Sequence, residues 1–245
     1  MMTEGMFTHY FLPGIWITIQ VTLYSAALGL VVAFLIGWLR TSRRWLVRFL
    51  AGAYFEIFRG MSALILMFWL VFALPVMFRW QLVPMWAAVL ALGLTYGAYG
   101  SEVVRGALAA VPAAQREAGI ALGFTRLQRL WRIELPQAWP EMLPPFNNLL
   151  IELLKGSALV STVTVADMTF AGNLVRLGTN ESAPIYTLLL VLYFVMAFLL
   201  TRGMRLLERR AKANVGQGIR TRRSSRAPRA EAGAGQGVLT AGGAR

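Results

Sequence analysis

The chain alternates long uncharged stretches with short polar ones. Residues 10–39 contain no charged side chain, and about 20 consecutive apolar residues are enough for a helix to cross the hydrocarbon core of a membrane. Similar stretches recur along the chain, and one of them includes charged residues. The pattern predicts an all-α integral membrane fold with about five transmembrane helices, at Ile15–Trp38, Gly60–Phe78, Leu82–Ser101, Phe146–Val165 and Pro184–Thr201.

The segments outside these stretches divide the chain into three regions. Residues 1–14 are predicted as an N-terminal segment, and residues 15–210 as the transmembrane domain. Residues 211–245 are rich in Gly, Ala, Ser and Arg. Because such a composition leaves little apolar surface to bury, we predict a disordered basic tail there.

Prolines mark the expected limits of the helices. Pro75 should kink or end the second span, because proline has no N–H to donate and its ring clashes with the preceding turn. The same reasoning places three further prolines before the fourth span or in its first turn: Pro140, Pro144 and Pro145. Residues 45–59 are predicted as a short interfacial helix, and residues 166–183 as a connection.

Small residues within the first and third spans predict close helix packing. Thr18, Thr22 and Ser25 recur near helical spacing on one face, where we expect them to pack against a neighbouring helix. Lining a polar path is the alternative for this face. Gly93 and Gly97 form a GxxxG pair, which suits the close approach of two helix backbones.

The one long polar segment, residues 101–136, begins with a predicted short helix. Pro112 suits a first helical turn, because its missing N–H is not needed there. Helix-forming residues follow through Leu122, and Gly123 then fits a left-handed stop.

A second short helix is predicted after that glycine. Thr125 and Gln128 form a capping-box pattern at its start. The helix should end near Leu135, because Pro136 disfavours helical backbone at the residue before it.

The distribution of arginine predicts the orientation in the membrane. Positively charged connections stay on the cytoplasmic side. Arg79 and Arg176 are the arginines of one side, whereas nine lie on the other, after the first span and in the polar segment. The N-terminus is therefore predicted outside, with the polar connection 106–137 and the tail in the cytoplasm.

Composition excludes several classes of function. The chain of 245 residues is 57% hydrophobic and contains no cysteine and one histidine. Thiolate chemistry is excluded, and so are histidine-rich metal sites and most acid–base enzymology. The formal charge of +13 is compatible with nucleic-acid binding. The basic residues flank apolar spans or fill the tail, however, and this distribution fits orientation in a membrane better. No phosphate-binding G-x-x-x-x-G-K-[ST] loop is present, so this chain is not expected to hydrolyse ATP.

Two charged residues inside the fourth predicted span are candidates for function. Glu152 and Lys155 are three residues apart and share a helix face. Charged groups inside a membrane usually face the bundle interior, so the pair either borders a solute path or forms an internal ion pair that fixes packing. Two other pairs with the same spacing are predicted as ion pairs within a helix: Glu102–Arg105 and Glu56–Arg59.

The order of residues in the polar segment resembles the "EAA" loop of ABC importer permeases. That pattern is Glu-Ala-Ala, three residues, Gly, nine residues, Ile-x-Leu-Pro, and the spacing here is the same. Gly119 stands where the family usually has the second alanine. The resemblance implies that residues 106–137 form a coupling loop, with these ATPase-coupling residues: Gln115, Glu117, Ala118, Gly119, Gly123, Ile133, Leu135 and Pro136.

Other segments resemble the polar-amino-acid branch of these permeases, which imports histidine, glutamine, glutamate and arginine. They are GIWITIQVTLYSAALGL at 14–30, AYFEIFRGMSALIL at 53–66, GAYGSEVVRG at 97–106 and KGSAL at 155–159. Ala63 replaces a usual proline, and Gly156 replaces a usual aspartate. Candidates for the translocation path are Tyr99, Glu152, Lys155 and Ser157. For Tyr99, helix packing is the alternative role.

The resemblance also implies the partners. Two permease subunits, identical or similar, would form the path in the inner membrane of a prokaryote, and an extracytoplasmic binding protein would deliver the solute. Two cytoplasmic ATPase subunits would bind ATP and Mg²⁺ and grip the loop helices, with Glu117 pairing a basic residue, so this chain needs no cofactor of its own. Secondary carriers, channels and membrane enzymes are the alternatives. The sequence has no evident inverted repeat, which many carriers show, and no cluster of carboxylates, which would favour an enzyme.

Overall fold

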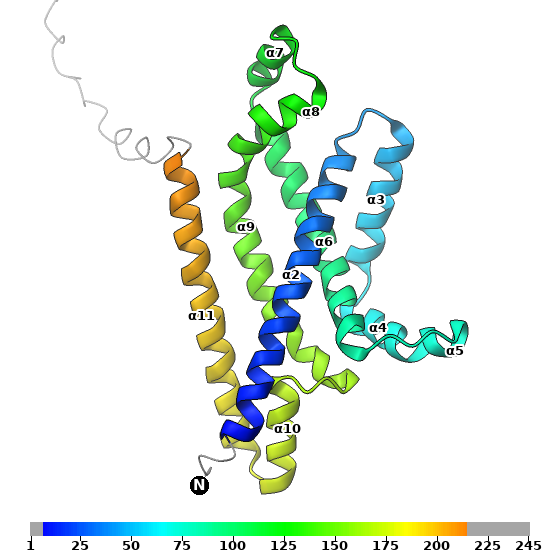
Figure 1. Ribbon diagram of the computed structural model, residues 1–245, viewed down its shortest axis with the longest axis vertical. Coiled ribbons are helices and arrows are strands. Elements are labelled where there is room, and N and C mark those ends of the chain that lie inside the picture. Colours follow the sequence, from blue (N-terminus) through cyan, green and yellow to red (C-terminus); the bar gives the residue numbers. More distant parts are fainter. Residues whose placement is uncertain (1–6, 215–245) are drawn as a thin grey trace, which may run out of the picture.

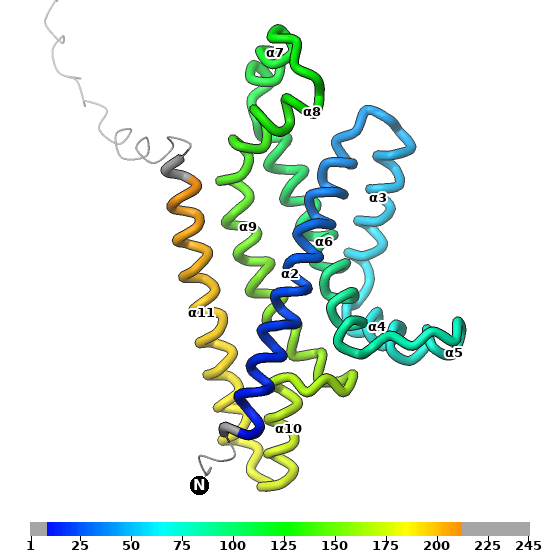
Figure 2. The backbone as a smooth tube through the Cα atoms, in the orientation of Figure 1, coloured from blue at the N-terminus to red at the C-terminus, as the bar shows by residue number. Residues whose placement is uncertain are grey.

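The fold is a bundle of long helices, which Figure 1 shows from the side with its longest axis vertical. The computed structural model describes residues 7–214, and this part of the chain contains helices and no strand. The long helices run side by side, and short helices lie at both ends (Figures 1 and 2). The long helices are α2 (Leu12–Arg40), α3 (Trp45–Gly60), α6 (Pro84–Ala110), α9 (Leu135–Gly156) and α11 (Ser182–Asn214).

Helices α2 and α6 pack at backbone distance along most of their length. A Cβ atom added at Gly37 would lie 2.8 Å from the carbonyl oxygen of Ser101. One added at Gly97 would lie 2.8 Å from Cβ of Val32. This contact, here called the α2–α6 seam, confirms the close approach predicted from the glycines of the third span. It is lined by Gly29, Ala33 and Gly37 of α2 and by Gly93, Gly97, Gly100, Ser101 and Val104 of α6.

The small polar residues of α2 are buried, as the packing prediction required. Thr18, Thr22 and Ser25 are each at most 3% exposed. The Thr18 hydroxyl donates to the carbonyl of Gly14 at 2.9 Å and accepts from the backbone N–H of Met168 at 3.1 Å. These contacts fix the start of α10 (Met168–Thr179) against the first turns of α2, so the face packs and does not line a path.

Three helices of the described chain are long and apolar enough to cross a membrane. They span His9–Arg40, Pro84–Ala110 and Ser182–Ala211. Two further pairs of helices meet the same test when each is taken as one bent span. The helices of one pair meet at 96° and those of the other at 53°. The prediction of an all-helical membrane fold is confirmed, whereas the straight second and fourth spans are not.

The second predicted span, Gly60–Phe78, is wrong as a straight helix. Helix α3 ends at Gly60, Met61 has extended backbone, and the chain turns by 96° into α4 (Ala63–Phe68), η2 (Trp69–Ala73) and α5 (Leu74–Phe78). These last three elements project sideways from the bundle (Figure 1). The π-turn η2 accommodates Pro75. The N–H of Leu74 donates to the carbonyl of Trp69, five residues earlier, instead of to the carbonyl four residues earlier as in an α-helix.

Residues 45–59 are also placed differently from the prediction. Helix α3 packs against α2 and α6 and does not lie apart from them at an interface. Phe55 is buried, and the hydroxyl of Tyr54 donates to the carbonyl of Leu94 at 2.8 Å. The expected pair of Glu56 and Arg59 does not form; the guanidinium of Arg59 lies 5.5 Å from the centre of the Phe55 ring.

The proline-based limits of the fourth span are wrong. The chain runs as a helix from α8 (Arg126–Arg129) through the π-turn η3 (Leu130–Glu134) into α9, with Pro140, Pro144 and Pro145 inside α9. In η3 the N–H of Leu135 reaches the carbonyl of Leu130, and this wider turn carries the helix past Pro136. Helix α9 ends at Gly156, and the rest of the predicted span is the 3₁₀ helix η4 (Ser157–Val163).

The N-terminal segment, the connection 166–183 and the start of the tail also differ from their predicted limits. Residues 7–14, predicted as part of a separate segment, form the π-turn η1 (Phe7–Phe11) and the start of α2. The predicted connection 166–183 contains α10, whose first turn is capped by the side chain of Asp167. Helix α11 continues to Asn214, past the predicted start of the tail. The remainder of both predictions, residues 1–6 and 215–245, lies outside the described residues.

Candidate coupling loop and transport surface

The first helix of the coupling loop, α7 (Ala113–Ala121), ends as the sequence predicts. Gly123 has a φ of +73°, which glycine adopts without strain. Its N–H donates to the carbonyl of Ile120 at 2.9 Å, and the N–H of Phe124 donates to that of Gly119 at 3.0 Å. This pair of bonds is a Schellman motif, so local sequence alone sets the turn.

The second helix of the loop, α8, also begins as predicted. The hydroxyl of Thr125 accepts from the N–H of Gln128 at 3.3 Å, and the Gln128 side chain accepts from the N–H of Thr125 at 2.9 Å. Both bonds of the capping box are therefore present. The predicted end near Leu135 is wrong, because η3 joins α8 to α9.

The two halves of the loop pack on each other through Gly119. A Cβ atom there would lie 2.8 Å from Cδ1 of Ile133 and 2.9 Å from Cγ of Arg129. Gly119 therefore makes a close contact with the following segment of the same loop, from α8 to η3. An ion pair between Nε of Arg129 and Oε1 of Glu134, at 3.8 Å, adds to this contact.

Most of α7 is exposed, apart from Gly119 and the half-buried Arg116. Gln115, Glu117 and Ala118 all lie on the surface. The side chain of Glu117 forms no hydrogen bond or ion pair with any described residue. Of the other predicted coupling residues, Gly123 and Pro136 are exposed, and Ile133 and Leu135 are half-buried. The loop therefore presents one free carboxylate on a support that its own sequence holds in shape.

Two arginines tie the loop to the ends of the long helices. The Arg116 guanidinium donates to the carbonyls of Leu108 and Ala109, at 2.6 and 3.1 Å. The Arg126 guanidinium donates to the carbonyl of Thr41, which follows the last residue of α2. Cations suit these positions because helix C-termini carry unpaired carbonyls. Sequence reasoning missed both contacts, since nothing local shows which carbonyl a long side chain reaches.

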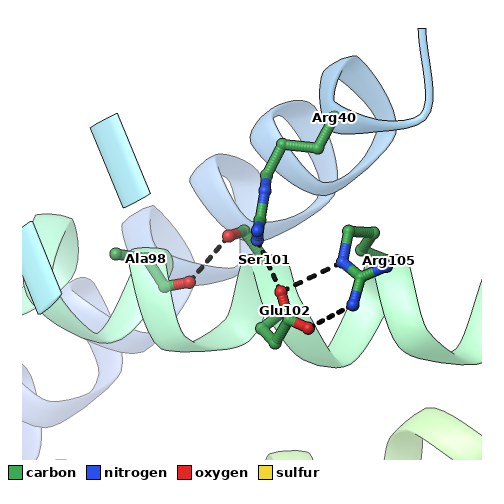
Figure 3. Close-up of polar contacts among 5 residues, drawn as sticks. All are labelled: Arg40, Ala98, Ser101, Glu102 and Arg105. Carbon is green, nitrogen blue, oxygen red and sulfur yellow. Dashed lines mark hydrogen bonds and ion pairs between the residues drawn. The ribbon is translucent and has the colours of Figure 1, made fainter. Parts of the chain in front are cut away.

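A charged cluster joins three helices where α2 ends (Figure 3). Glu102 and Arg105 form the ion pair that their spacing predicts. Arg40 of α2 also reaches Glu102, with 2.6 Å between Nη1 and Oε2, and its guanidinium lies 4.1 Å from the centre of the Phe55 ring. The cluster thus links α2, α3 and α6.

The structure separates the four translocation-path candidates. Glu152 and Lys155 are exposed and form no ion pair with each other or with any described residue, so the packing alternative gains no support. Tyr99 is half-buried, and its hydroxyl donates to the carbonyl of Arg59 at 3.4 Å. Ser157 is 1% exposed and donates to the carbonyl of Leu154, so it faces the interior and not the surface of Glu152.

Glu152 and Lys155 belong to a longer polar stripe on α9. Glu141 lies seven residues before Asn148, and Asn148 lies four residues before Glu152; both are exposed, and this spacing places all four residues on one helix face. A groove of about 520 Å³ between α6 and α9 begins beside this stripe, and it is lined by Glu102, Gln137 and Glu141 among others. Sequence reasoning missed Glu141 because the predicted span began after it, at Phe146, and it did not single out Asn148 within that span, although their spacing with Glu152 is helical.

Comparison with known proteins identifies the family of this fold and loop. Residues 25–213 match the family described as binding-protein-dependent transport system inner membrane component. The chain belongs to this family. The membership confirms the resemblance read from the EAA loop, and it favours a non-catalytic permease over a carrier, a channel or an enzyme.

Relatives of known type agree with this assignment. A probable amino-acid ABC transporter permease protein of Sinorhizobium fredii, y4tF, is 47% identical over 200 residues, covering 80% of this chain and 84% of the relative. The glutamine transport system permease protein GlnP of Escherichia coli is 32% identical, with coverages of 82% and 92%.

Solved structures share the fold. A crystal structure of an amino acid ABC transporter with histidines matches with a TM-score of 0.76 and 28% identity, covering 86% of this chain and 100% of that one. An inward-facing structure of the MetNI methionine ABC transporter matches with a TM-score of 0.73 at 23% identity, with coverages of 86% and 99%, and this likeness supports the fold alone.

Proposed function

We propose that this permease forms the translocation path of an ATP-driven importer for a polar amino acid or a related small solute. The observation that carries the proposal is the free carboxylate of Glu117 on a locally capped loop, in a chain of the permease family. The class of solute is supported by the names of the relatives, which include amino-acid and glutamine permeases. ATP and Mg²⁺ would bind to a separate ATPase, and an extracytoplasmic protein would deliver the solute.

In the proposed coupling role, the α7 helix of each permease subunit would contact one ATPase subunit. Glu117 would pair with a basic residue of the ATPase, and Gln115 and Ala118 would lie within the contact. The other predicted coupling residues, which are Gly119, Gly123, Ile133, Leu135 and Pro136, would act by holding the shape of the loop. ATP-driven closure of two ATPase subunits would then move the loop and the helices α6 and α9 at its ends, since a partner shifts an equilibrium by binding one state better.

A charge reversal tests the coupling role. The chain would be expressed with its neighbouring genes, solubilised in mild detergent and purified by a tag. Glu117→Arg would be compared with Glu181→Arg, because Glu181 is an exposed glutamate in the connection between α10 and α11, outside the loop. We expect the ATPase to follow the wild type and the control, and to be lost or uncoupled from solute in Glu117→Arg. If no ATPase follows the wild type and flux persists without ATP, the proposal fails.

The proposed topology has five spans, two of them bent, with the N-terminus outside. Figure 1 supports it, because the α7–α8 loop, the α2–α3 connection and the far end of α11 lie at one end, and α10 with the start of α2 lies at the other. The chain has no cysteine. Single cysteines can therefore be placed at Gly178 and Ala121 and tested with an impermeant maleimide in intact cells. Labelling at Gly178 alone is expected, and labelling at Ala121 alone would reverse the topology.

The polar stripe of α9 is proposed to face the solute, together with Tyr99 of α6. The stripe lies on the surface of this chain, so a second permease copy or a similar sister chain would enclose it. The buried Ser157 would support the stripe from behind. We expect Lys155→Met to abolish uptake while the ATPase and second permease still co-purify, because the side chain of Lys155 is exposed and forms no ion pair with any described residue. Loss of assembly in this variant would assign Lys155 to packing.

A further inference from the structure

A second cavity, separate from the polar stripe, lies where the coupling loop meets the helix ends. It has a volume of about 280 Å³ and is bounded by the end of α2, the end of α6, and the α7–η3 part of the loop. Its charged lining residues are Arg43, Arg116, Arg126, Arg129 and Glu134. Trp38, Leu108 and Leu130 supply apolar walls. We call it the arginine pocket.

The lining of the arginine pocket carries a net positive charge. Arginines outnumber carboxylates four to one in its lining. The C-terminal ends of α2 and α6 also lie here, and each contributes roughly half a negative charge. A surplus of about two positive charges therefore remains, in a site that is enclosed on several sides by protein.

The donors in the pocket are only partly used. Arg43 forms no hydrogen bond or ion pair with any described residue. The Nε atom of Arg116 is buried without a hydrogen-bond partner among the described residues, and that of Arg129 has only the ion pair with Glu134, whose 3.8 Å separation is too long for a hydrogen bond. Such buried donors are costly to leave unpaired, so each points to a missing acceptor.

The geometry of the pocket is fixed before any ligand binds. Bonds from Arg116 to the carbonyls of α6, and from Arg126 to that of Thr41, hold two guanidinium groups in place with further N–H groups unused. Arg129 forms an ion pair with Glu134 on the same side of the pocket. Planar guanidinium groups with free donors match the oxygens of phosphate, to which they can donate two parallel hydrogen bonds.

We propose that the arginine pocket binds a phosphate group, carried by the head group of an anionic phospholipid or supplied as a free phosphate. Trp38 favours the lipid source, because tryptophan at the end of a spanning helix marks the head-group level of the membrane. A phosphate there would bridge the first cytoplasmic connection and the coupling loop. Binding would then stiffen the support of α7 without touching its exposed face.

The test uses the intact complex, purified in mild detergent and depleted of lipid. Native mass spectrometry would count bound dioleoyl-phosphatidylglycerol, with dioleoyl-phosphatidylcholine as the neutral comparison. Arg43→Gln removes one pocket charge without breaking a described contact, and Arg48→Gln is the matched control, because Arg48 is an exposed arginine of α3 outside the pocket. A second variant, Arg43→Glu, reverses the charge.

We expect phosphatidylglycerol to be retained in preference to phosphatidylcholine, and to bind about fivefold more weakly to Arg43→Gln than to the control, as one basic contact near a membrane surface implies. Arg43→Glu should weaken it further. A free-phosphate arm repeats the titration with inorganic phosphate and follows the fluorescence of Trp38 in a variant whose other tryptophans are phenylalanine. A response to phosphate that Arg43→Gln weakens, without any lipid preference, would assign the site to free phosphate.

Two results would overturn the proposal. Equal retention of both lipids and no phosphate response in wild type and variants would leave the arginines as helix caps alone. Loss of the ATPase from Arg43→Glu, with lipid retention unchanged, would assign the pocket to a protein contact. The proposal does not rest on import or on the solute, so a failure of the Glu117 experiment and a failure here are independent.

Discussion

The α2–α6 seam and the coupling loop both use glycine to bring two helices together, but the neighbours of the glycines differ. In the seam, Gly37 faces the carbonyl oxygen of Ser101, and Gly29 faces the carbonyl of Gly93. In the loop, Gly119 faces side-chain atoms only, which are Cδ1 of Ile133 and Cγ and Cδ of Arg129. Backbone atoms cannot move aside without shifting a whole helix, whereas a side chain can take another rotamer.

This difference distinguishes the seam, which belongs to the folded core of the permease, from the loop, which is proposed to contact the ATPase. The seam is buried and belongs to the core of the bundle. The loop is mostly exposed, and its shape depends on a capping box, a Schellman turn and a few long side chains. We infer that the seam resists substitution, and that the loop can be altered while the bundle stays folded.

The strongest test of the comparison is Gly37→Leu in the seam. The new side chain would overlap the Ser101 carbonyl and the Val104 side chain, so we expect destabilisation of at least about 3 kcal/mol and a sharp loss of folded protein. Gly52→Leu is the matched control, because a Cβ atom there meets nothing within 4 Å. Size-exclusion of a fluorescent fusion after heating would measure both. Equal yields of the two variants would contradict a rigid seam.

A smaller effect is expected from Glu102→Gln at the end of the seam. Arg40 is 15% exposed in its side chain and would lose its counter-charge, while the amide keeps the size of the carboxylate. We expect a loss of about 1–2 kcal/mol, below the range for a fully buried pair because Glu102 is 42% exposed. The thermal midpoint in detergent would report it, with Glu141→Gln as the control. A midpoint no lower than that of the control would show that the cluster adds no stability.

A local effect is expected from Thr125→Ala in the loop. The substitution removes the acceptor for the Gln128 N–H, which costs about 1 kcal/mol of helix stability. We expect exchange of the Gln128 amide hydrogen to be about fivefold faster, as that free energy implies, with the thermal midpoint of the bundle unchanged. Hydrogen-exchange mass spectrometry would resolve the two. A lower midpoint would mean that the loop and the bundle unfold together.

The smallest effect is expected from Gly119→Ala. Alanine gains up to about 1 kcal/mol of helix propensity over glycine, and the atoms it meets first are the ends of Ile133 and Arg129. We expect a net change within about 0.5 kcal/mol and full coupling of ATPase activity to solute. Gly97→Ala is the contrasting variant, because its Cβ meets Val32 at 2.8 Å and the Gly29 carbonyl oxygen at 3.2 Å. Equal tolerance of the two changes would remove the distinction between seam and loop.

The sequence by itself determined the features that depend on neighbours along the chain. The uncharged stretches predicted the membrane helices, and the order Thr125, Gln128 and Gly123 predicted the loop's caps, because each acts within a few residues. The EAA pattern led to the family for the same reason. The spacing of Glu102 and Arg105 likewise predicted their pair.

Tertiary structure decided where the chain departs from those local rules. The chain turns by 96° after Gly60, and helical backbone continues past Pro75 and Pro136 through the π-turns η2 and η3, against the local preference of proline. The partner of Arg40 and the gathering of four arginines into one pocket depend on helices distant in sequence. Long side chains can reach several partners, and only the packing of the seam and the loop fixes which ones they meet.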